Sequence, residues 1–320
     1  MDWPLVGRAA ELEKLLAALR ADDRAAAVVT GPAGVGKTRL ALECLAQAAA
    51  DGATTAGVAG SAGASQIPFG LFDTLIAAQD SSPPAVLAAL SGLAGSGAPL
   101  VLLVDNASLV DPASAAVLHQ LVMSGGAFVV FTMRSGEQPP DALTGLRKED
   151  AVVAIELAGL DRRAVDELLP RALGHPVAGA TSQAVWDASH GNPLYVRELV
   201  RGALADGQLQ LDAGVWRLTR PLTTTPVLEQ LVLARLADLA PEAERAVELL
   251  AIGEPLPLAW LVADAGLEAL DAIEQREVAR LGDGDAVRLA DPVYGDVVRA
   301  SLSASRRQEL SRRLADLAEA

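Results

Sequence analysis

The sequence predicts a parallel α/β domain that is followed by two regions built mainly from helices. Three observations support this fold class. A glycine-rich motif stands at residues 31–38, strand-like and helix-like segments alternate over residues 26–157, and helical patterns dominate from residue 161 onward. The expected domain boundaries therefore enclose residues 1–157, 158–222 and 223–320.

Composition limits the classes of function. The chain has 320 residues, of which 51% are hydrophobic and only 3% aromatic, so aliphatic side chains must build the core. A formal net charge of −15 argues against binding of nucleic acid by this chain itself, because duplex binding needs a basic face. Cys44 is the only cysteine, and we interpret it as a packing residue. The sequence has neither a signal segment nor an apolar run of 18 residues, so we expect a cytoplasmic protein without a membrane partner.

The motif at residues 31–38, GPAGVGKT, fits the phosphate-binding loop G-x-x-x-x-G-K-[ST]. A predicted strand at 26–30 precedes it and a predicted helix at 39–49 follows it, as the motif requires; a plain glycine-rich turn before a helix would not need both. Backbone amides and the helix N-terminus would bind phosphate oxygens, Lys37 would reach the outer phosphates, and Thr38 would hold Mg²⁺. The expected phosphate-binding residues are Gly31, Ala33, Gly34, Val35, Gly36, Lys37 and Thr38.

An amphipathic helix is predicted at Ala9–Arg20, ahead of the loop, with leucines on one face. The turn before it, formed by Val6, Gly7 and Arg8, could supply one wall of an adenine pocket. The alternative is that this segment only begins a surface helix.

A continuous apolar strand at 100–105 ends in Asp105. Strands that are apolar on both faces belong inside parallel sheets, and an acid at the carboxyl end faces the ligand crevice. We therefore take Asp105 and the following Asn106 as the candidate catalytic pair, with Thr38 and Asp105 as the magnesium-binding residues. Asn106 cannot accept a proton from an attacking water, so hydrolysis is slow or another group orients the water. An equally good interpretation is that Asn106 only shapes the following loop.

Three further strands are predicted for the sheet, at 127–134, 152–157 and 54–60, which makes five in all with those at 26–30 and 100–105. Arg134 ends the first of these, where it could contact the γ-phosphate; the alternative is a solvent-facing arginine. Helices are predicted at 69–78, 84–90 and 112–123, with Asp111 as the N-cap of the last.

The rest of the chain is expected to contain almost no strand. Helices are predicted at 161–169, 181–189 and 194–204 in the middle region. Pro193 begins the last of these and could also lie against a base, although capping alone explains it. His190 has no partner ligands at metal spacing, and we interpret it as structural.

In the final region, four predicted helices between 228 and 280 precede a hairpin signal at 278–289, and two more helices follow. Helices with one short hairpin favour a winged-helix domain. The predicted fold class is thus an α/β P-loop nucleoside triphosphatase sheet, followed by a helical domain and a winged-helix domain.

Read together, these segments resemble the STAND class of signalling ATPases, and within it the large ATP-binding regulators of the LuxR type. The resemblance covers nearly the whole chain. Its phosphate loop is generic, whereas the segments GNPL at 191–194 and DPVYGDVV at 291–298 narrow it. The other matching segments are VGR at 6–8, Arg39 directly after the phosphate loop, IPFG at 67–70, LVD at 103–105, DPAS at 111–114 and TMR at 132–134.

The resemblance implies an ATP/ADP switch with Mg²⁺, closed with ADP and open and able to self-associate with ATP. It implies contacts to nucleotide from Val6–Arg8, Arg39, Arg134, Pro193 and Asp291. Full-length relatives bind DNA through a helix-turn-helix domain that this chain does not contain. The family usually has an acid at position 106 and a histidine at position 291, where an aspartate would repel phosphate.

Three functions remain open at this stage. The first is a nucleotide-operated switch in a transcriptional regulator, with hydrolysis slow at most. The second is an active ATPase that does mechanical work, which Asn106 argues against. The third is a degenerate scaffold that binds nucleotide weakly or not at all, which Asn106 and Asp291 would favour.

Overall fold

The computed structural model describes residues 3–21, 25–73, 75, 82–93, 98–146 and 152–319. It contains two compact units. One comprises Leu5–Ala158, and the other contains the chain from Gly159 onward. Each unit is described by itself below.

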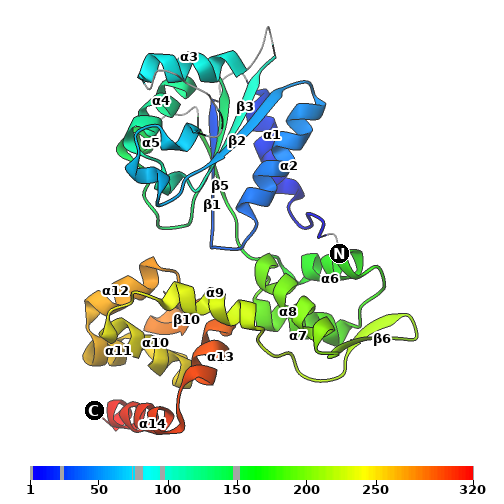
Figure 1. Ribbon diagram of the computed structural model, residues 1–320. Helices are drawn as coiled ribbons and strands as arrows, with labels where there is room; N and C mark the ends of the chain where they lie inside the picture. Colours follow the sequence, from blue (N-terminus) through cyan, green and yellow to red (C-terminus); the bar gives the residue numbers. More distant parts are fainter. Residues whose placement is uncertain are drawn as a thin grey trace. The chain divides into compact units, whose positions relative to one another are not determined.

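The first unit is built on a five-stranded parallel sheet in the order β2-β3-β4-β1-β5 (Figure 1). The strands are β1 (Ala26–Thr30), β2 (Thr54–Ala59), β3 (Leu100–Asp105), β4 (Phe128–Thr132) and β5 (Val152–Glu156). The three central strands are buried along almost their whole length because helices cover both faces. All five predicted strands are present.

Alternate residues of the central strands face two separate helical layers (Figure 1). On one face Val29 and Val101 pack with Leu15, Leu40 and Cys44 of α1 (Ala9–Arg20) and α2 (Lys37–Ala50). The helices α3 (Pro83–Leu93), α4 (Pro112–Met123) and α5 (Asp141–Leu146) contribute to the core on the other face. Cys44 is fully buried in this core, as expected for a packing residue, and burial raises the pKa of its thiol to about 11.

The predicted helix at 69–78 is only partly visible in the described residues. A 3₁₀ turn at Gly70–Phe72 is observed, and residues 74 and 76–81 lie outside the described part of the chain. The predicted N-cap Asp111 is confirmed, since its carboxylate accepts a hydrogen bond from the Ser114 amide at 2.9 Å.

The second unit begins with three helices, α6 (Arg162–Leu173), α7 (Gly179–Ser189) and α8 (Pro193–Ala205), followed by a β-hairpin that the sequence analysis missed. Its strands are β6 (Leu209–Asp212) and β7 (Val215–Leu218), paired antiparallel. The two turn residues, Ala213 and Gly214, have φ angles of 47° and 78°. This is the backbone of a primed hairpin turn, for which Asn-Gly is the usual signal, so an alanine in the first position concealed it.

The remaining helices of this unit surround one apolar core together with a small antiparallel sheet in the order β8-β10-β9 (Figure 1). The hairpin expected at 278–289 is confirmed by the pairing of β9 with β10. The elements are α9 (Pro226–Leu236), α10 (Pro241–Gly253), β8 (Leu256–Pro257), α11 (Leu258–Ala265), α12 (Leu267–Gln275), β9 (Ala279–Leu281), β10 (Ala286–Leu289) and α13 (Pro292–Ser301).

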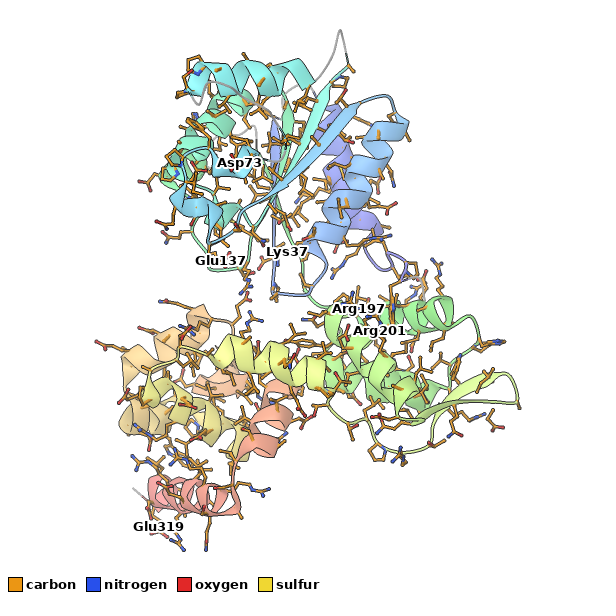
Figure 2. The ribbon with its side chains drawn as sticks, viewed as in Figure 1. Lys37, Asp73, Glu137, Arg197, Arg201 and Glu319 are labelled. Atoms are coloured by element: carbon orange, nitrogen blue, oxygen red, sulfur yellow. The ribbon has the colours of Figure 1, made fainter. Side chains whose placement is uncertain are left out.

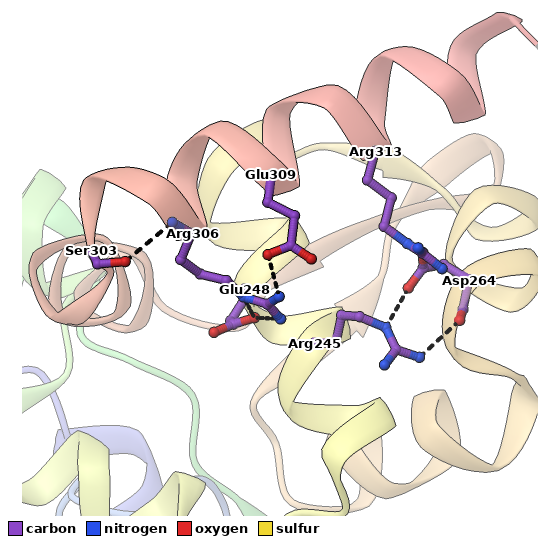
Figure 3. Close-up of polar contacts among 7 residues, drawn as sticks. All are labelled: Arg245, Glu248, Asp264, Ser303, Arg306, Glu309 and Arg313. Atoms are coloured by element: carbon purple, nitrogen blue, oxygen red, sulfur yellow. Dashed lines mark hydrogen bonds and ion pairs between the residues drawn. The ribbon is translucent and has the colours of Figure 1, made fainter.

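The last helix, α14 (Ala304–Glu319), packs on the core through Leu310 and Leu314 and also forms ion pairs with the rest of the unit (Figure 3). Leu310 is its only fully buried residue. Arg306 pairs with Glu248 at 2.6 Å, and Arg313 pairs with the buried Asp264, which also binds Arg245 at 2.9 Å. Among the described helices of both units, none has the length and apolar character needed to cross a bilayer.

Candidate functional site

The phosphate loop lies between β1 and α2, as the motif predicts. Gly31, Gly34 and Gly36 have φ angles of 149°, 79° and 102°, which side chains disfavour. At Gly31 space is also limiting, because an added Cβ would lie 2.4 Å from the Leu157 carbonyl oxygen. At Gly36 the space is open, so the backbone conformation alone requires glycine.

Lys37 is the first residue of α2 and is 9% exposed. Its ammonium donates hydrogen bonds to the carbonyl oxygens of Gly31 and Pro32, both at 2.7 Å. These contacts hold the cation against the loop at the positive end of the helix. A cation and backbone amides at a helix N-terminus form a binding site for phosphate oxygens.

Thr38 and Asp105 meet at the carboxyl ends of the strands. The Thr38 hydroxyl donates to Asp105 Oδ1 at 2.8 Å. The Thr132 hydroxyl, at the end of β4, donates to the same oxygen. Thr132 is fully buried and reaches Asp105 because β4 lies between β1 and β3. Only Arg134 was singled out from the sequence at this strand end; the position of Thr132 near the end of the same predicted strand was the available signal for its role.

Asn106 adopts the left-handed conformation, with φ of 53° and ψ of 53°. Asparagine tolerates this region better than most residues. The turn that follows, Ala107–Leu109, closes through a hydrogen bond from the Leu109 amide to the Asn106 carbonyl at 2.9 Å. The Asn106 side chain makes no capping hydrogen bond, so its effect on this loop comes from its backbone.

Arg134 lies beyond the end of β4, and its side chain is 51% exposed. Its Nε is 3.8 Å from Oε1 of Glu137. The other carboxylate oxygen of Glu137 accepts from the Ser108 hydroxyl at 2.6 Å. Neither Glu137 nor Ser108 belongs to a sequence motif, and only the fold brings them together.

Arg8 is buried, with 6% exposure, and connects three segments. Its guanidinium pairs with Glu11 at 3.1 Å, donates to the Val35 carbonyl at 3.3 Å and donates to the Ala158 carbonyl. Val6 is buried too, and Gly7 has a φ of 66°. The predicted Val6–Arg8 turn therefore supports the phosphate loop directly, in addition to any contact with a base.

Arg39 lies on α2, directly after the phosphate loop, and forms an exposed pair with Glu43 at 3.6 Å. Pro193 and Asp291 belong to the second unit. Pro193 occupies the first turn of α8, whose N-cap Asn192 accepts from the Leu194 amide at 3.1 Å. His190 stacks on Trp186 and contacts the Asp187 carbonyl, in keeping with a structural role.

Asp291 is the N-cap of α13 and accepts a hydrogen bond from the Val293 amide at 3.1 Å. It is 8% exposed. Burial raises its pKa to about 7, although the Val293 amide and the positive charges of Arg280 and Arg235 oppose that shift. At neutral pH a large fraction of Asp291 is therefore protonated and uncharged.

The residues of the first unit fit a nucleotide with Mg²⁺. Hydroxyl and carboxylate oxygens, which Thr38 and Asp105 provide side by side, are the ligands that Mg²⁺ prefers, and phosphates and water normally complete its shell. Within the described ranges no group of three or more His, Cys, Asp or Glu side chains could hold a metal. A magnesium ion here would accordingly depend on the phosphates for part of its coordination.

Residues 4–130 match the model of a protein family described as the AAA ATPase domain. No curated protein matches the chain in sequence. Three solved structures with some similarity are Hsp104 of S. cerevisiae in complex with ADP, a RuvB variant of Thermotoga maritima and Cdc6p of Pyrobaculum aerophilum.

Their sequence identities to this chain are 16%, 17% and 14%, with TM-scores of 0.48, 0.49 and 0.49. The alignments cover 64%, 89% and 94% of this chain, and 38%, 92% and 96% of theirs. The chain thus spans well under half the length of Hsp104. The segment that carries the phosphate loop and Asp105 is similar in sequence to an AAA-type nucleotide-binding ATPase module.

Proposed function

We propose that the chain is the ATP/ADP-binding switch module of a transcriptional regulator, in which the bound nucleotide selects between a closed state and an open, self-associating state. The observation that carries the proposal is the cluster of Lys37, Thr38 and Asp105 at one end of a parallel sheet. A ligand can shift such an equilibrium only by binding one state more tightly than the other.

Each residue of the cluster has a distinct task in this proposal. Lys37 would exchange its contacts with the loop carbonyls for the outer phosphates, since an ammonium prefers an anion to a neutral oxygen. Thr38 and Asp105 would hold Mg²⁺, which neutralises the phosphate charge when bound. Thr132 would keep Asp105 in place through the shared Oδ1.

The three-domain division at 157/158 and 222/223, and the winged-helix assignment of residues 223–320, are part of the same proposal. The confirmed β9–β10 hairpin beside the α10–α13 helices supports the winged-helix assignment. Pro193 and Asp291 would contact the nucleotide in the closed state. DNA contact would require a domain outside these 320 residues.

An ionised aspartate would repel a phosphate, but the raised pKa of Asp291 weakens this repulsion because part of the population is protonated. A protonated carboxyl carries no negative charge and can donate a hydrogen bond to an anion. The closed state, in which Asp291 contacts the nucleotide, would therefore be favoured below pH 7, where Asp291 is protonated, and opposed above it.

The test is nucleotide binding by the purified chain. Nucleotide that co-purifies is identified by mass, and calorimetry measures ADP and ATP affinity for the wild type, Lys37→Ala and Lys14→Ala. Lys14 is a matched control, because its ammonium binds the Ala154 carbonyl on the edge strand β5. Lys37→Ala should weaken binding by at least about 100-fold, or about 2.7 kcal/mol, and Lys14→Ala by less than about twofold.

If Lys37→Ala binds ADP as the wild type does, the switch proposal fails. If the wild type binds no nucleotide, the chain is a degenerate scaffold, an alternative that Asn106 supports. Size-exclusion chromatography with ADP and with ATP then tests the change of state separately.

A further inference from the structure

The turn that follows β4 folds one carboxylate back toward the nucleotide end of the sheet. Residues 134–137 form a hydrogen-bonded β-turn, in which the Glu137 amide donates to the Arg134 carbonyl at 3.3 Å and Gly136 has a φ of 79°. The Glu137 carboxylate then accepts from the Arg134 amide at 3.2 Å. Its position is thus set by the backbone of its own turn.

The same turn touches the loops on both sides of β4. On one side, the Ser135 amide donates to the carbonyl of Gly31, the first residue of the phosphate loop, at 3.4 Å. On the other side, Ser108 donates its hydroxyl to Glu137 Oε2 at 2.6 Å, two residues after Asn106. Lys37 and Glu137 lie at the same end of the sheet in Figure 2. Because β4 lies between β1 and β3, its exit turn borders the loops that follow both neighbouring strands.

The two carboxylate oxygens of Glu137 are used unequally. Oε2 accepts both well-placed hydrogen bonds, from Ser108 and the Arg134 amide. Among the described residues, Oε1 has only the 3.8 Å contact with the Arg134 guanidinium, and the Arg134 side chain is 51% exposed. An ion pair this long and exposed contributes little. Oε1 is therefore the oxygen that can accept a proton.

Hydrolysis at this site lacks a base at the expected position. Asn106 cannot accept a proton, and Asp105 Oδ1 is occupied by the hydroxyls of Thr38 and Thr132. We propose that Glu137 is the catalytic carboxylate of this site, anchored by Ser108 and acting in place of residue 106. The proposal rests on the nucleotide-binding function above and adds a slow ATPase reaction to it.

In the reaction, the oxygen of a water molecule forms a bond to the γ-phosphorus of ATP. The bond between that phosphorus and the β,γ-bridging oxygen breaks, and ADP leaves with the electron pair. The proton of the attacking water passes to Glu137 Oε1 and from there to solvent. The products are ADP, inorganic phosphate and a proton.

The experiment measures phosphate release from radiolabelled ATP with Mg²⁺, at saturating nucleotide, together with ATP and ADP affinity. Glu137→Gln keeps the shape and the hydrogen bond from Ser108, so it should lower the rate by about 100-fold, the usual range for loss of a general base. Both affinities should stay within about twofold of the wild type. Glu13→Gln, on the exposed face of α1, is the matched control and should leave the rate unchanged.

Two further variants separate catalysis from a structural role. Ser108→Ala should lower the rate by several-fold, since it frees the carboxylate without removing it. Asn106→Asp in the Glu137→Gln background should restore part of the rate, because it returns a carboxylate to the position next to Asp105. If Glu137 served only to pair with Arg134, Asn106→Asp would not restore the rate. In that case Arg134→Ala and Glu137→Gln would lower the rate of phosphate release equally.

Wild-type phosphate release in Glu137→Gln would overturn this inference. So would a wild type that binds ATP but releases no phosphate above background; the binding function would survive both results. Absence of nucleotide binding in the wild type would instead overturn the proposed function and the inference together.

Discussion

Asp105 in the parallel-sheet unit and Asp264 in the helical unit both accept short hydrogen bonds, but their partners differ. Asp105 is held by the neutral hydroxyls of Thr38 and Thr132, which leave its negative charge available to a cation. The side chain of Asp264 is 1% exposed and is held by Arg245 and Arg313, which neutralise it (Figure 3). The partners of a carboxylate, more than the residue type, therefore decide whether its charge is available to a ligand or is used within the fold.

Asp291 is a third case within the helical unit. It is 8% exposed, and it has no ion pair within salt-bridge distance among the described residues. Protonation neutralises its carboxylate instead, because burial raises the pKa of Asp291 to about 7. Four substitutions test these distinctions. Three of the four tryptophans, Trp186, Trp216 and Trp260, lie in the helical unit and none lies in Leu5–Ala158, so tryptophan fluorescence reports mainly on the helical unit.

Asp291→Asn should have the largest effect, and the effect should depend on pH. The folded-state pKa of Asp291 lies above its unfolded value of 3.8, so its stabilisation is complete below that value and is lost as pH rises through about 7. Between pH 5 and pH 9 the unfolding free energy of the wild type should fall by about 3 kcal/mol relative to that of Asp291→Asn. Asparagine can still cap the helix but carries no charge. Urea unfolding followed by tryptophan fluorescence measures this difference, and a pH-independent difference would contradict it.

Asp264→Ala should come next, with a loss of about 2 kcal/mol in the unfolding free energy of the helical unit. Removal of the shared carboxylate leaves Arg245 and Arg313 close together without a counter-charge. Both arginines are partly exposed and can be hydrated, which keeps the loss below that of a fully buried pair. Nucleotide affinity should not change; a matching loss of affinity would show that the comparison with Asp105 is wrong.

Thr132→Val should weaken binding of Mg²⁺-ATP by about tenfold, or about 1.4 kcal/mol, and binding of ATP without Mg²⁺ by much less. Valine preserves the shape but removes the hydroxyl that orients Asp105. Calorimetry with Mg²⁺ and with EDTA measures both affinities. Thr144→Val is the control, because among the described residues that hydroxyl binds only the Pro139 carbonyl, at 3.2 Å. Equal losses with and without Mg²⁺ would mean that Thr132 supports the loop in general.

Arg313→Ala should have the smallest effect, below about 1 kcal/mol, and high salt should reduce it further. The side chain is 50% exposed, and Arg245 still neutralises Asp264 in its absence. Urea unfolding at low and high salt checks the prediction. A loss as large as that of Asp264→Ala would mean that α14 depends on this one ion pair.

Much of the candidate site was predictable because its signals are local. The phosphate loop, Asp105 at the end of an apolar strand and the cap at Asp111 each depend on residues within one segment. The five parallel strands followed from the same short-range patterns. The β6–β7 hairpin was missed for an equally local reason, since an alanine occupies a position that usually carries asparagine.

The sequence by itself determined the five strands of the parallel sheet, the β9–β10 hairpin and the place of the phosphate loop, because hydrophobic period and turn chemistry act over a few residues. Only the tertiary structure decided that β4 lies between β1 and β3, which places Thr132 against Asp105 and Glu137 against Ser108. It also decided that Asp291 is buried without an ion pair. Strand order and burial depend on contacts between distant segments, and the pKa and chemical role of a carboxylate follow from those contacts.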